Sequence, residues 1–376
     1  MPLTQAKHLI SSKVINYVSH SKKTLVLHNA AKEGNLIEAQ YVQDYHIKSV
    51  LSLPILNQGK LIGILYLENS LVEGAFSADR VELLSTLVSQ VAISIENALL
   101  YENLEQKVQE RTKQLKDALG DIHASINYAK RIQTAILPVS QKISEVLPEH
   151  FIYFKPKDVV SGDFYWFAHK KDEQIDLSIL TAIDCTGHGV PGAFMSMIGD
   201  ATLNQIVHDQ EIHRPDLILN EMHKRIQNTL NQNEASVRDG MDMALISIDH
   251  QQNIMSFAGA MNPFYYVKNG EFVEIKADKF AIGGASGKQE RVFTLHNILI
   301  DSEITFYLCS DGYQDQFGGA AIRKFMVKRF RELLFSVYHL PMEEQKQVIS
   351  DSMYDWKRQD TLSQTDDILV IGAKIG

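Results

Sequence analysis

Four aspartates constrain this chain more than any other feature, because each lies at the end of an apolar, strand-like run and far from the others in sequence. They are Asp163, Asp184, Asp311 and Asp366, the last of which precedes Asp367. A fold that gathers strand ends at one edge assembles their carboxylates, which hard divalent cations such as Mg²⁺ or Mn²⁺ prefer as ligands. Each site alone is also explained as a turn. The prediction of metal-assisted chemistry on a phosphate therefore depends on the four together.

Length and charge limit the classes of protein to consider. A chain of 376 residues is long for one core, so we expect two or three domains. A net charge of -9 argues against a nucleic-acid partner, which needs a basic face. Cys185 and Cys309 read as buried thiols in a reducing compartment. We find no stretch long enough for a membrane span and no signal peptide at residues 1–7, so we expect a cytoplasmic protein.

Residues 1–100 are predicted to form a mixed α/β domain. Apolar runs at 49–55 and 61–67 are joined by Asn-Gln-Gly-Lys, which indicates a hairpin, and Ser77 can cap a following helix. The motifs at 53–55, 59–67, 76–79 and 95–98 resemble the second half of a GAF sensory domain. The resemblance implies a partial GAF domain, which could be a working sensor or a dimerisation platform without ligand.

Residues 101–138 show the pattern of one long polar helix. Apolar side chains recur at alternating spacings of three and four, which is typical of a coiled coil and predicts a parallel homodimer. Pro138 is expected to end the helix, and Gly120 within it costs about 1 kcal/mol relative to Ala. His123 is interpreted as a solvated side chain and not as a phosphoacceptor, since no Gly-rich ATP-binding motifs follow.

Residues 139–376 contain all four aspartates and are predicted to form a separate domain. Many strands with few, clustered helices favour an α+β layered sandwich over repeated βαβ units. We expect strands at 151–154, 176–183, 243–249, 254–258, 264–267, 272–275, 292–295, 303–308 and 368–372. We expect helices at 191–208, 215–231, 320–337 and 342–358.

Five motifs in this segment occur in a fixed order that resembles one family. They are Ser-Gly-Asp-Phe-Tyr at 161–165, Asp-Cys-Thr-Gly-His-Gly-Val-Pro-Gly-Ala at 184–193, Asp-Gly-Met-Asp-Met-Ala at 239–244, Ser-Asp-Gly at 310–312 and Asp-Asp at 366–367. Together they are similar to the SpoIIE/RsbU-type branch of the bacterial metal-dependent serine/threonine phosphatases. The resemblance implies a β-sandwich flanked by helices, in αββα order.

The resemblance also implies a site with two Mg²⁺ or Mn²⁺ ions. Asp184 would bridge the ions and Cys185 would contribute its backbone carbonyl, while Asp163, Asp311 and Asp366 would supply the other protein ligands; Asp367 is the less favoured member of its pair. A metal-activated water would then attack phosphoserine or phosphothreonine. The expected substrate is a phosphorylated regulatory protein, such as an antagonist of an anti-sigma factor.

Several residues near these motifs remain open in their interpretation. The loop Gly187, His188 and Gly189 leads into a helix whose first turn holds Pro191, and a helix N-terminus can bind an anion. The loop therefore approaches substrate or merely shapes the site. We interpret Asp242 as structural, and Ser161 replaces a glycine that is usual in the family. A pseudophosphatase that only binds a partner is the alternative, which the four acidic positions disfavour.

Overall fold

The structure is a computed structural model that describes residues 10–232, 238–284 and 291–376. The chain divides into two compact units, Met1–Leu119 and Gly120–Gly376. The expectation about a signal peptide at residues 1–7 lies outside the described residues.

The first unit is a small antiparallel sheet covered by helices. Its strands β1 (Leu25–Leu27), β2 (Ser49–Asn57) and β3 (Lys60–Asn69) are ordered β1-β2-β3, and β2 and β3 form the predicted hairpin. Apolar residues of α1 (Ser12–Ser21) and α2 (Ala39–Asp44) pack in one core with Leu27 and Val50. Val88 of α3 (Ala78–Ile136) packs in a second core with Leu51 and Leu53, because alternate residues of β2 face opposite sides.

The helix α3 is continuous over 59 residues and begins directly after Ser77, as predicted. It runs through Gly120 and ends at Ile136, two residues before Pro138. Leu115, Leu119 and Ile122 are 63%, 48% and 53% exposed, so none of the described residues covers this part of the apolar stripe. By length and composition alone, the helical stretch Ala78–Ser144 could cross a membrane, with a mean hydropathy of 1.5 over its most apolar window. One such helix is weak evidence for a membrane span, but it differs from the expectation that no stretch of the chain is long enough for one.

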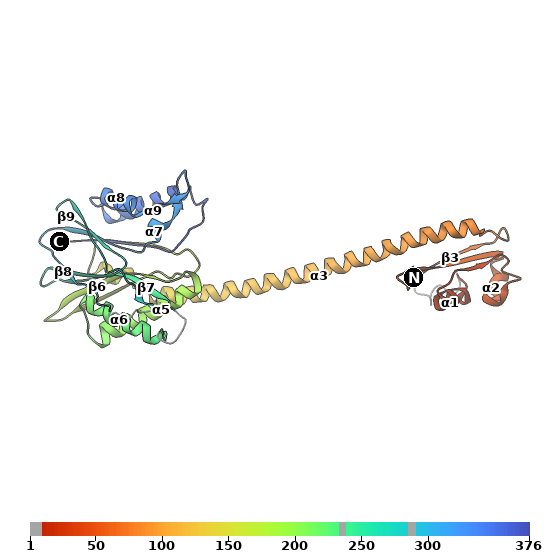
Figure 1. The fold of residues 1–376 in the computed structure, drawn as a ribbon, viewed down its shortest axis with the longest axis horizontal. Helices are drawn as coiled ribbons and strands as arrows, with labels where there is room; N and C mark the ends of the chain where they lie inside the picture. Colours follow the sequence, from red (N-terminus) through yellow and green to blue (C-terminus); the bar gives the residue numbers. More distant parts are fainter. Residues whose placement is uncertain (1–9, 233–237, 285–290) are drawn as a thin grey trace. The chain divides into compact units, whose positions relative to one another are not determined.

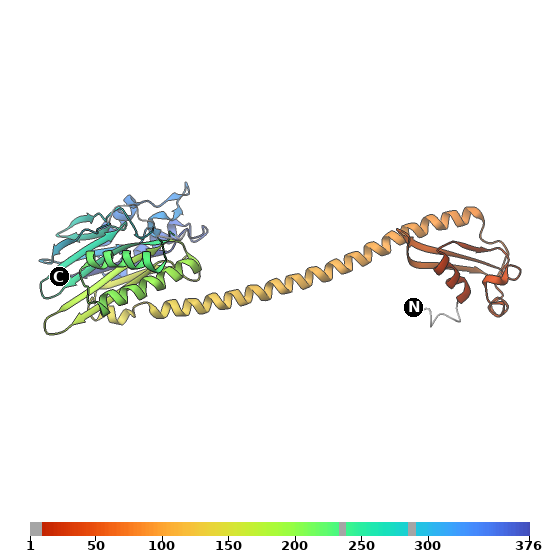
Figure 2. The same cartoon turned by 60° about the horizontal axis from the view of Figure 1, so that its bottom comes forward.

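The second unit has four layers, helices–sheet–sheet–helices (Figure 1; Figure 2). The six-stranded sheet has the order β12-β8-β7-β6-β5, with β11 paired to β7, and the five-stranded sheet has the order β10-β9-β13-β16-β4. The strands are β4 (His150–Lys155), β5 (Phe164–Lys171), β6 (Asp176–Cys185), β7 (Gly240–Asp249), β8 (Ile254–Ala260), β9 (Phe264–Lys268), β10 (Glu271–Ile275), β11 (Ile282–Gly283), β12 (His296–Leu299), β13 (Ile304–Cys309) and β16 (Ile368–Ile375).

Helices cover the outer face of each sheet. Helices α5 (Gly189–Asn204) and α6 (Pro215–Thr229) lie on the six-stranded sheet, and α8 (Val327–Val337) and α9 (Met342–Trp356) lie on the five-stranded sheet (Figure 1). The remaining elements are α4 (Ser140–Ser144), a π-helical turn at Gln205–Asp209, α7 (Gly312–Asp315) and the hairpin of β14 (Phe317–Gly318) and β15 (Arg323–Lys324). The predicted αββα sandwich is confirmed.

Alternation along the strands explains the layering. Ile179 and Ile183 of β6 join the core under α5 and α6, whereas Leu180 and Ala182 join the core between the two sheets. A strand that is apolar on both faces is buried on both faces, and this forces a layer of structure on each side.

The structure departs from the predicted elements in several places. β5 was not predicted, although Asp163 directly precedes it, so this aspartate begins a strand and does not end one. The predicted strand at 292–295 is irregular chain, and the strand β12 follows it. The predicted helix at 320–337 begins only at Val327, because residues 323–324 pair as β15.

Candidate active site

Antiparallel pairing brings the four aspartates to one edge of the sandwich. Phe164 of β5 lies opposite Ile183 of β6, which places Asp163 beside the end of β6, where Asp184 lies. In the other sheet, Cys309 of β13 lies opposite Val370 of β16, so Asp311 after β13 and Asp366 before β16 flank the same edge. Because the N-terminal end of one strand meets the C-terminal end of its antiparallel neighbour, residues far apart in sequence become adjacent.

Hydrogen bonds tie the strand ends and the segment before β5 together at this edge. The Asp367 carboxylate accepts one bond from the backbone N–H of Gly162 and another from that of Lys157, both at 2.7 Å. The Ser310 hydroxyl accepts a bond from the backbone N–H of Leu369 at 3.1 Å. Asp367 is therefore occupied in joining the segment before β5 to β16, and Asp366 is the member of the pair that faces the pocket.

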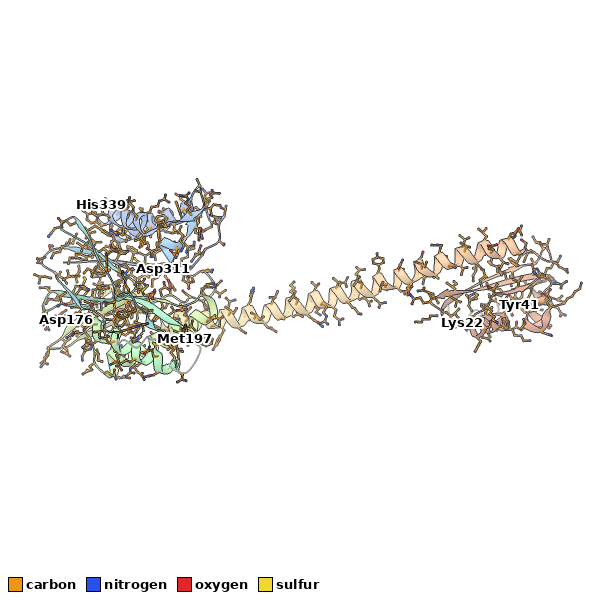
Figure 3. The ribbon with its side chains drawn as sticks, viewed as in Figure 1. Lys22, Tyr41, Asp176, Met197, Asp311 and His339 are labelled. Carbon is orange, nitrogen blue, oxygen red and sulfur yellow. The ribbon has the colours of Figure 1, made fainter. Side chains whose placement is uncertain are left out.

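A pocket of about 180 Å³ lies at the meeting point of these strand ends. Its lining combines carboxylates with the loop before α5 and consists of Asp184, Cys185, Thr186, Gly187, His188, Asp242, Asp311 and Asp366. Asp311, at the start of α7, is labelled in Figure 3. Asp163 is not in the lining, and it is only 3% exposed.

Close backbone packing explains the glycine in Ser-Gly-Asp. A Cβ atom at Gly162 would lie 2.4 Å from the carbonyl oxygen of Gly187 and 3.2 Å from that of Cys185. Any side chain at this position would push the loop of residues 185–187 away from Asp163. The Cys185 side chain packs in the core under α5, and the residue also lines the pocket.

The pocket concentrates acidic groups whose charges oppose one another. Burial raises the pKa of Asp163 well above its ordinary value, and the carboxylates of Asp367, Asp366 and Asp311 raise it further against a hydrogen bond from Ser310. Burial also raises the pKa of Asp184, and the charges of Asp163 and Asp311 add to this. Burial likewise raises the pKa of Asp311, and the charges of Asp315 and Asp366 add to this.

Asp242 belongs to this cluster, although the sequence analysis interpreted it as structural. It lies directly opposite Asp184 in the pairing of β7 with β6 and lines the same pocket. Burial and then the charge of Asp311 raise its pKa to about 7. Asp242 lies in the motif at 239–244, and the register of β6 against β7 shows that it belongs beside Asp184.

Ser161 and the end of α3 are linked by a buried amide. The Gln133 side chain accepts a hydrogen bond from the Ser161 backbone N–H at 3.0 Å and donates one to its carbonyl oxygen at 2.6 Å. The same amide nitrogen donates to the Ser196 hydroxyl of α5 at 2.9 Å. Gln133 therefore fixes the segment that carries Asp163, and the sequence analysis did not identify it.

Residues 177–376, more than half of the chain, match the family described as stage II sporulation protein E (SpoIIE). This chain belongs to the SpoIIE family. The SiaA-PP2C domain of Pseudomonas aeruginosa is a similar solved structure, 31% identical, with a TM-score of 0.61 over 69% of this chain and 99% of that domain. The SpoIIE-family chain therefore carries a phosphatase domain of the kind that the ordered motifs predicted, and phosphatases of the PP2C fold are metal-dependent.

The N-terminal part also has relatives. Residues 3–95 match the GAF domain, which confirms that resemblance. The hybrid signal transduction histidine kinase G of Dictyostelium discoideum is 42% identical over 93 residues, 25% of this chain and 3% of that protein. The peroxide stress-activated histidine kinase mak3 of Schizosaccharomyces pombe is 29% identical over 129 residues, 33% of this chain and 5% of that protein. The chain spans only a small fraction of these two curated relatives.

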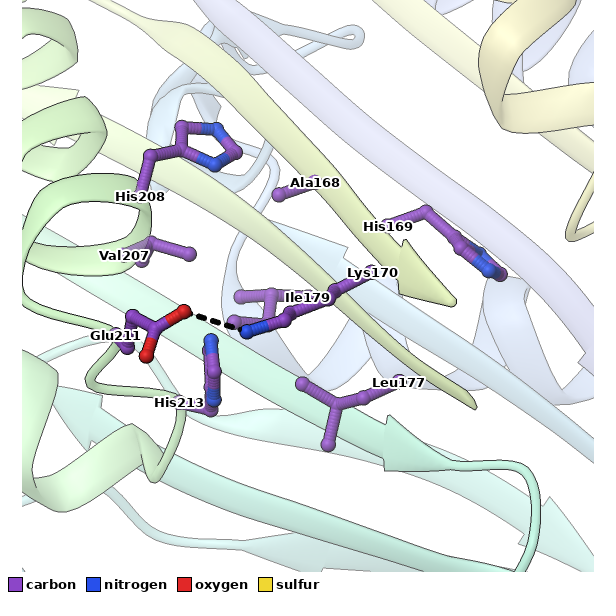
Figure 4. A pocket seen from close by; sticks show the side chains of 9 residues that line it. All are labelled: Ala168, His169, Lys170, Leu177, Ile179, Val207, His208, Glu211 and His213. Carbon is purple, nitrogen blue, oxygen red and sulfur yellow. Dashed lines mark hydrogen bonds and ion pairs between the residues drawn. The ribbon is translucent and has the colours of Figure 1, made fainter. Parts of the chain in front are cut away.

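A second cavity, of about 190 Å³, lies between β5, β6, the π-helical turn at Gln205–Asp209 and the chain that follows this turn (Figure 4). Lys170 is directed toward Glu211, and their charged atoms are 2.7 Å apart. His213 lies beside this pair, and burial lowers its pKa. Because the lysine and glutamate charges are already paired, we place the chemistry in the acidic pocket and not here.

Proposed function

We propose that this SpoIIE-family phosphatase hydrolyses phosphoserine or phosphothreonine on a regulatory protein with the help of two Mg²⁺ or Mn²⁺ ions. The carboxylates of Asp163, Asp184, Asp311 and Asp366 and the carbonyl of Cys185 would hold the ions. The supporting observation is the convergence of buried acidic groups, with raised pKa values, on one strand edge. A carboxylate cluster without cations is costly, and divalent cations relieve its repulsion.

The residues present fit such ions in their chemistry. The Oδ2 atom of Asp163 is buried and has no hydrogen-bond partner in the described part of the chain, so one acceptor is left for a cation. Among the described residues, no group of three or more His, Cys, Asp or Glu side chains has the geometry of a metal site. Backbone and water ligands would therefore have to complete the coordination. Mg²⁺ retains several waters and uses few carboxylates, which agrees with a sparse protein ligand set.

The surrounding residues position the reacting groups. Bound divalent cations would supply Lewis-acid chemistry, lowering the pKa of water and neutralising phosphate charge. Asp367 holds the backbone of Lys157 and Gly162 in place, and Gln133 holds Ser161. The loop Gly187, His188 and Gly189 opens α5 at the pocket, where the substrate phosphate would enter.

The organisation of the whole chain supports a signalling role. A GAF domain precedes a long helix whose apolar stripe is exposed, and the phosphatase domain follows. We assign residues 1–100 to the partial GAF domain, 101–138 to a coiled-coil helix that forms a homodimer, and 139–376 to the phosphatase. The proposed substrate is an anti-sigma-factor-antagonist-type protein, and the proposed location is the cytoplasm.

Hydrolysis of p-nitrophenyl phosphate and of a phosphoserine protein tests this proposal directly. The measurement compares Mn²⁺, Mg²⁺ and chelator, using the wild type and Asp184→Asn. We expect turnover only with metal and a loss of at least a hundredfold in the variant, in line with the removal of a principal transition-state charge interaction. Metal-independent turnover, or full activity of Asp184→Asn, would refute the proposed site.

A further inference from the structure

A chain of polar contacts connects the segment before β5 to the loop before α5, at the rim of the acidic pocket. The Lys157 ammonium lies 2.9 Å from His188 Nε2, and His188 Nδ1 lies 2.6 Å from the Asp158 carboxylate. His188 lines the pocket, so the ammonium is one hydrogen bond away from the pocket lining.

The charges of these three groups define the direction of both hydrogen bonds. A carboxylate can only accept, so His188 donates its Nδ1–H to Asp158. An ammonium can only donate, so the neutral Nε2 atom accepts from Lys157. Within the described residues His188 is the partner of this ammonium, so two of its three N–H donors remain available to an anion.

Two further features show that the arrangement is fixed. Gly189 leaves room for the Asp158 carboxylate, since a Cβ atom at Gly189 would lie 3.1 Å from Asp158 Oδ2. The Lys157 backbone N–H is bound to Asp367, which ties the base of this side chain to the active-site edge. The charge of Lys157 also acts on Asp366, where it opposes the effect of burial on the pKa.

A structural explanation of the contacts is weaker. The side chains of His188 and Asp158 are 48% and 46% exposed. Exposed pairs of this kind contribute little to folding, because water screens them and their side chains lose entropy. A cation beside a pocket of carboxylates is better explained by phosphate binding. The oxygens of a bound phosphate need positive charge in addition to that of the metals.

We propose that Lys157, oriented by His188 and Asp158, binds the phosphoryl oxygens of the substrate. This inference rests on the proposed phosphatase function. It assigns His188 a positioning role, because its ring holds the lysine, and it gives the loop Gly187, His188 and Gly189 a reason to lie at the pocket. The ligand class is a phosphate monoester dianion.

The test measures phosphate binding independently of turnover. Calorimetry of inorganic phosphate binding to the full chain in saturating Mn²⁺ is compared for wild type, Lys157→Met and Lys157→Arg. We expect phosphate to bind roughly tenfold to a hundredfold more weakly to Lys157→Met, the range for one charge-assisted hydrogen bond. Lys157→Arg keeps the charge and should lose less. The Michaelis constant for p-nitrophenyl phosphate should rise in parallel, with a smaller change in kcat.

Lys324→Met is the matched control for a general loss of charge. Lys324 is paired with Asp315 at 2.7 Å, and its charge also acts on Asp311 and Asp366. We expect phosphate affinity to change less than twofold in this variant. Equal losses of phosphate affinity in Lys157→Met and Lys324→Met would show that the overall positive charge near the pocket, and not a contact with Lys157, attracts phosphate. That result would overturn the proposal.

Further outcomes separate the inference from the phosphatase assignment. Unchanged phosphate binding in a folded Lys157→Met variant overturns the lysine assignment, even if the wild type is an active phosphatase. Absence of phosphate binding in the wild type overturns it as well. Replacing His188 by Ala should weaken binding less than Lys157→Met, and His188→Gln, whose amide can accept from the ammonium, should restore part of the loss.

Discussion

At the scale of single residues, the carboxylates of the candidate active site repel one another. Burial raises the pKa of Asp163, Asp184, Asp242, Asp311 and Asp366 above their ordinary values, and their mutual charges add to this for most of them. A carboxyl group with a raised pKa in the folded state opposes folding once it is ionised. The metal-free protein is therefore destabilised by the groups that a cation would use.

Asp242 gives this repulsion a measurable pH dependence. Its pKa is raised from 3.8 to about 7, so between these values the folded state binds more protons than the unfolded chain. The contribution of this group to stability is therefore complete below about pH 4 and is lost as the pH rises through about 7. In chelator, the melting temperature of the wild type should fall between about pH 5.5 and about pH 8, and Asp242→Asn should show a smaller fall.

Thermal unfolding followed by circular dichroism checks this prediction. Asp172→Asn is the control, because Asp172 is exposed and its pKa is lowered by backbone hydrogen bonds from Gln174 and Ile175. That variant should not reduce the fall. If Asp242→Asn showed the same pH dependence as the wild type, Asp242 would not be the group that titrates.

At the scale of secondary structure elements, Gln133 links α3 to the edge that carries the four aspartates. Gln133 is buried, and its side-chain amide bonds both the backbone N–H and the carbonyl oxygen of Ser161. Ser161 lies two residues before Asp163. Ser196 of α5 binds the same amide, so α3 holds both the strand β5 and the helix that follows the His188 loop. A small displacement of α3 would move these elements together.

Replacing Gln133 by Ala should therefore lower activity without removing any proposed ligand. The change leaves the buried N–H and C=O of Ser161 without partners, at about 1–3 kcal/mol for each unsatisfied group. We expect a lower melting temperature, a weaker apparent affinity for Mn²⁺ and roughly a tenfold lower kcat, as misplaced catalytic groups typically cause. Gln114→Ala, on the exposed part of α3, should change none of these. Wild-type kinetics in Gln133→Ala would exclude the positioning role.

The exposed stripe of α3 carries the prediction of a dimer. Replacing Leu119, Ile122 and Ile126 by polar residues should abolish self-association, because these side chains form the hydrophobic seam of the expected coiled coil. Phosphatase activity should then fall or lose its regulation. Light scattering gives the mass and p-nitrophenyl phosphate gives the activity. A variant that remains dimeric and equally active would contradict this role of the helix.

The elements also show what sequence alone could supply. Hairpins and helices with strong local signals, such as residues 49–67 and α9, were predicted because turn residues and periodicity suffice there. β5 was missed because it ends in His169, Lys170 and Lys171, and its pairing with β6 decides its conformation. Gln133 was not identified and Asp242 was interpreted as structural, because their places in the site depend on contacts across strands and between distant segments, which no local pattern encodes.

At the scale of the whole molecule, the chain consists of two compact units with separate cores. The candidate metal residues all lie in the unit Gly120–Gly376, so cations should stabilise that unit and not the GAF unit. A ligand that binds only the folded state stabilises it by about 2.7 kcal/mol at a hundredfold excess over its dissociation constant. For a unit of this size, that corresponds to a shift of about 5–10 °C in melting temperature.

Differential scanning calorimetry of the full chain should therefore show two transitions, of which Mn²⁺ raises only one. Asp184→Asn should abolish most of this shift, because it removes the proposed bridging carboxylate while leaving the cores intact. In chelator the same variant should melt no lower than the wild type, since it also removes one of the opposed acidic groups. If Mn²⁺ raised both transitions equally, or raised that of Asp184→Asn as much as the wild type, binding would occur outside the acidic pocket. This calorimetric result alone would then require other residues as the metal ligands, whatever an assay of turnover showed.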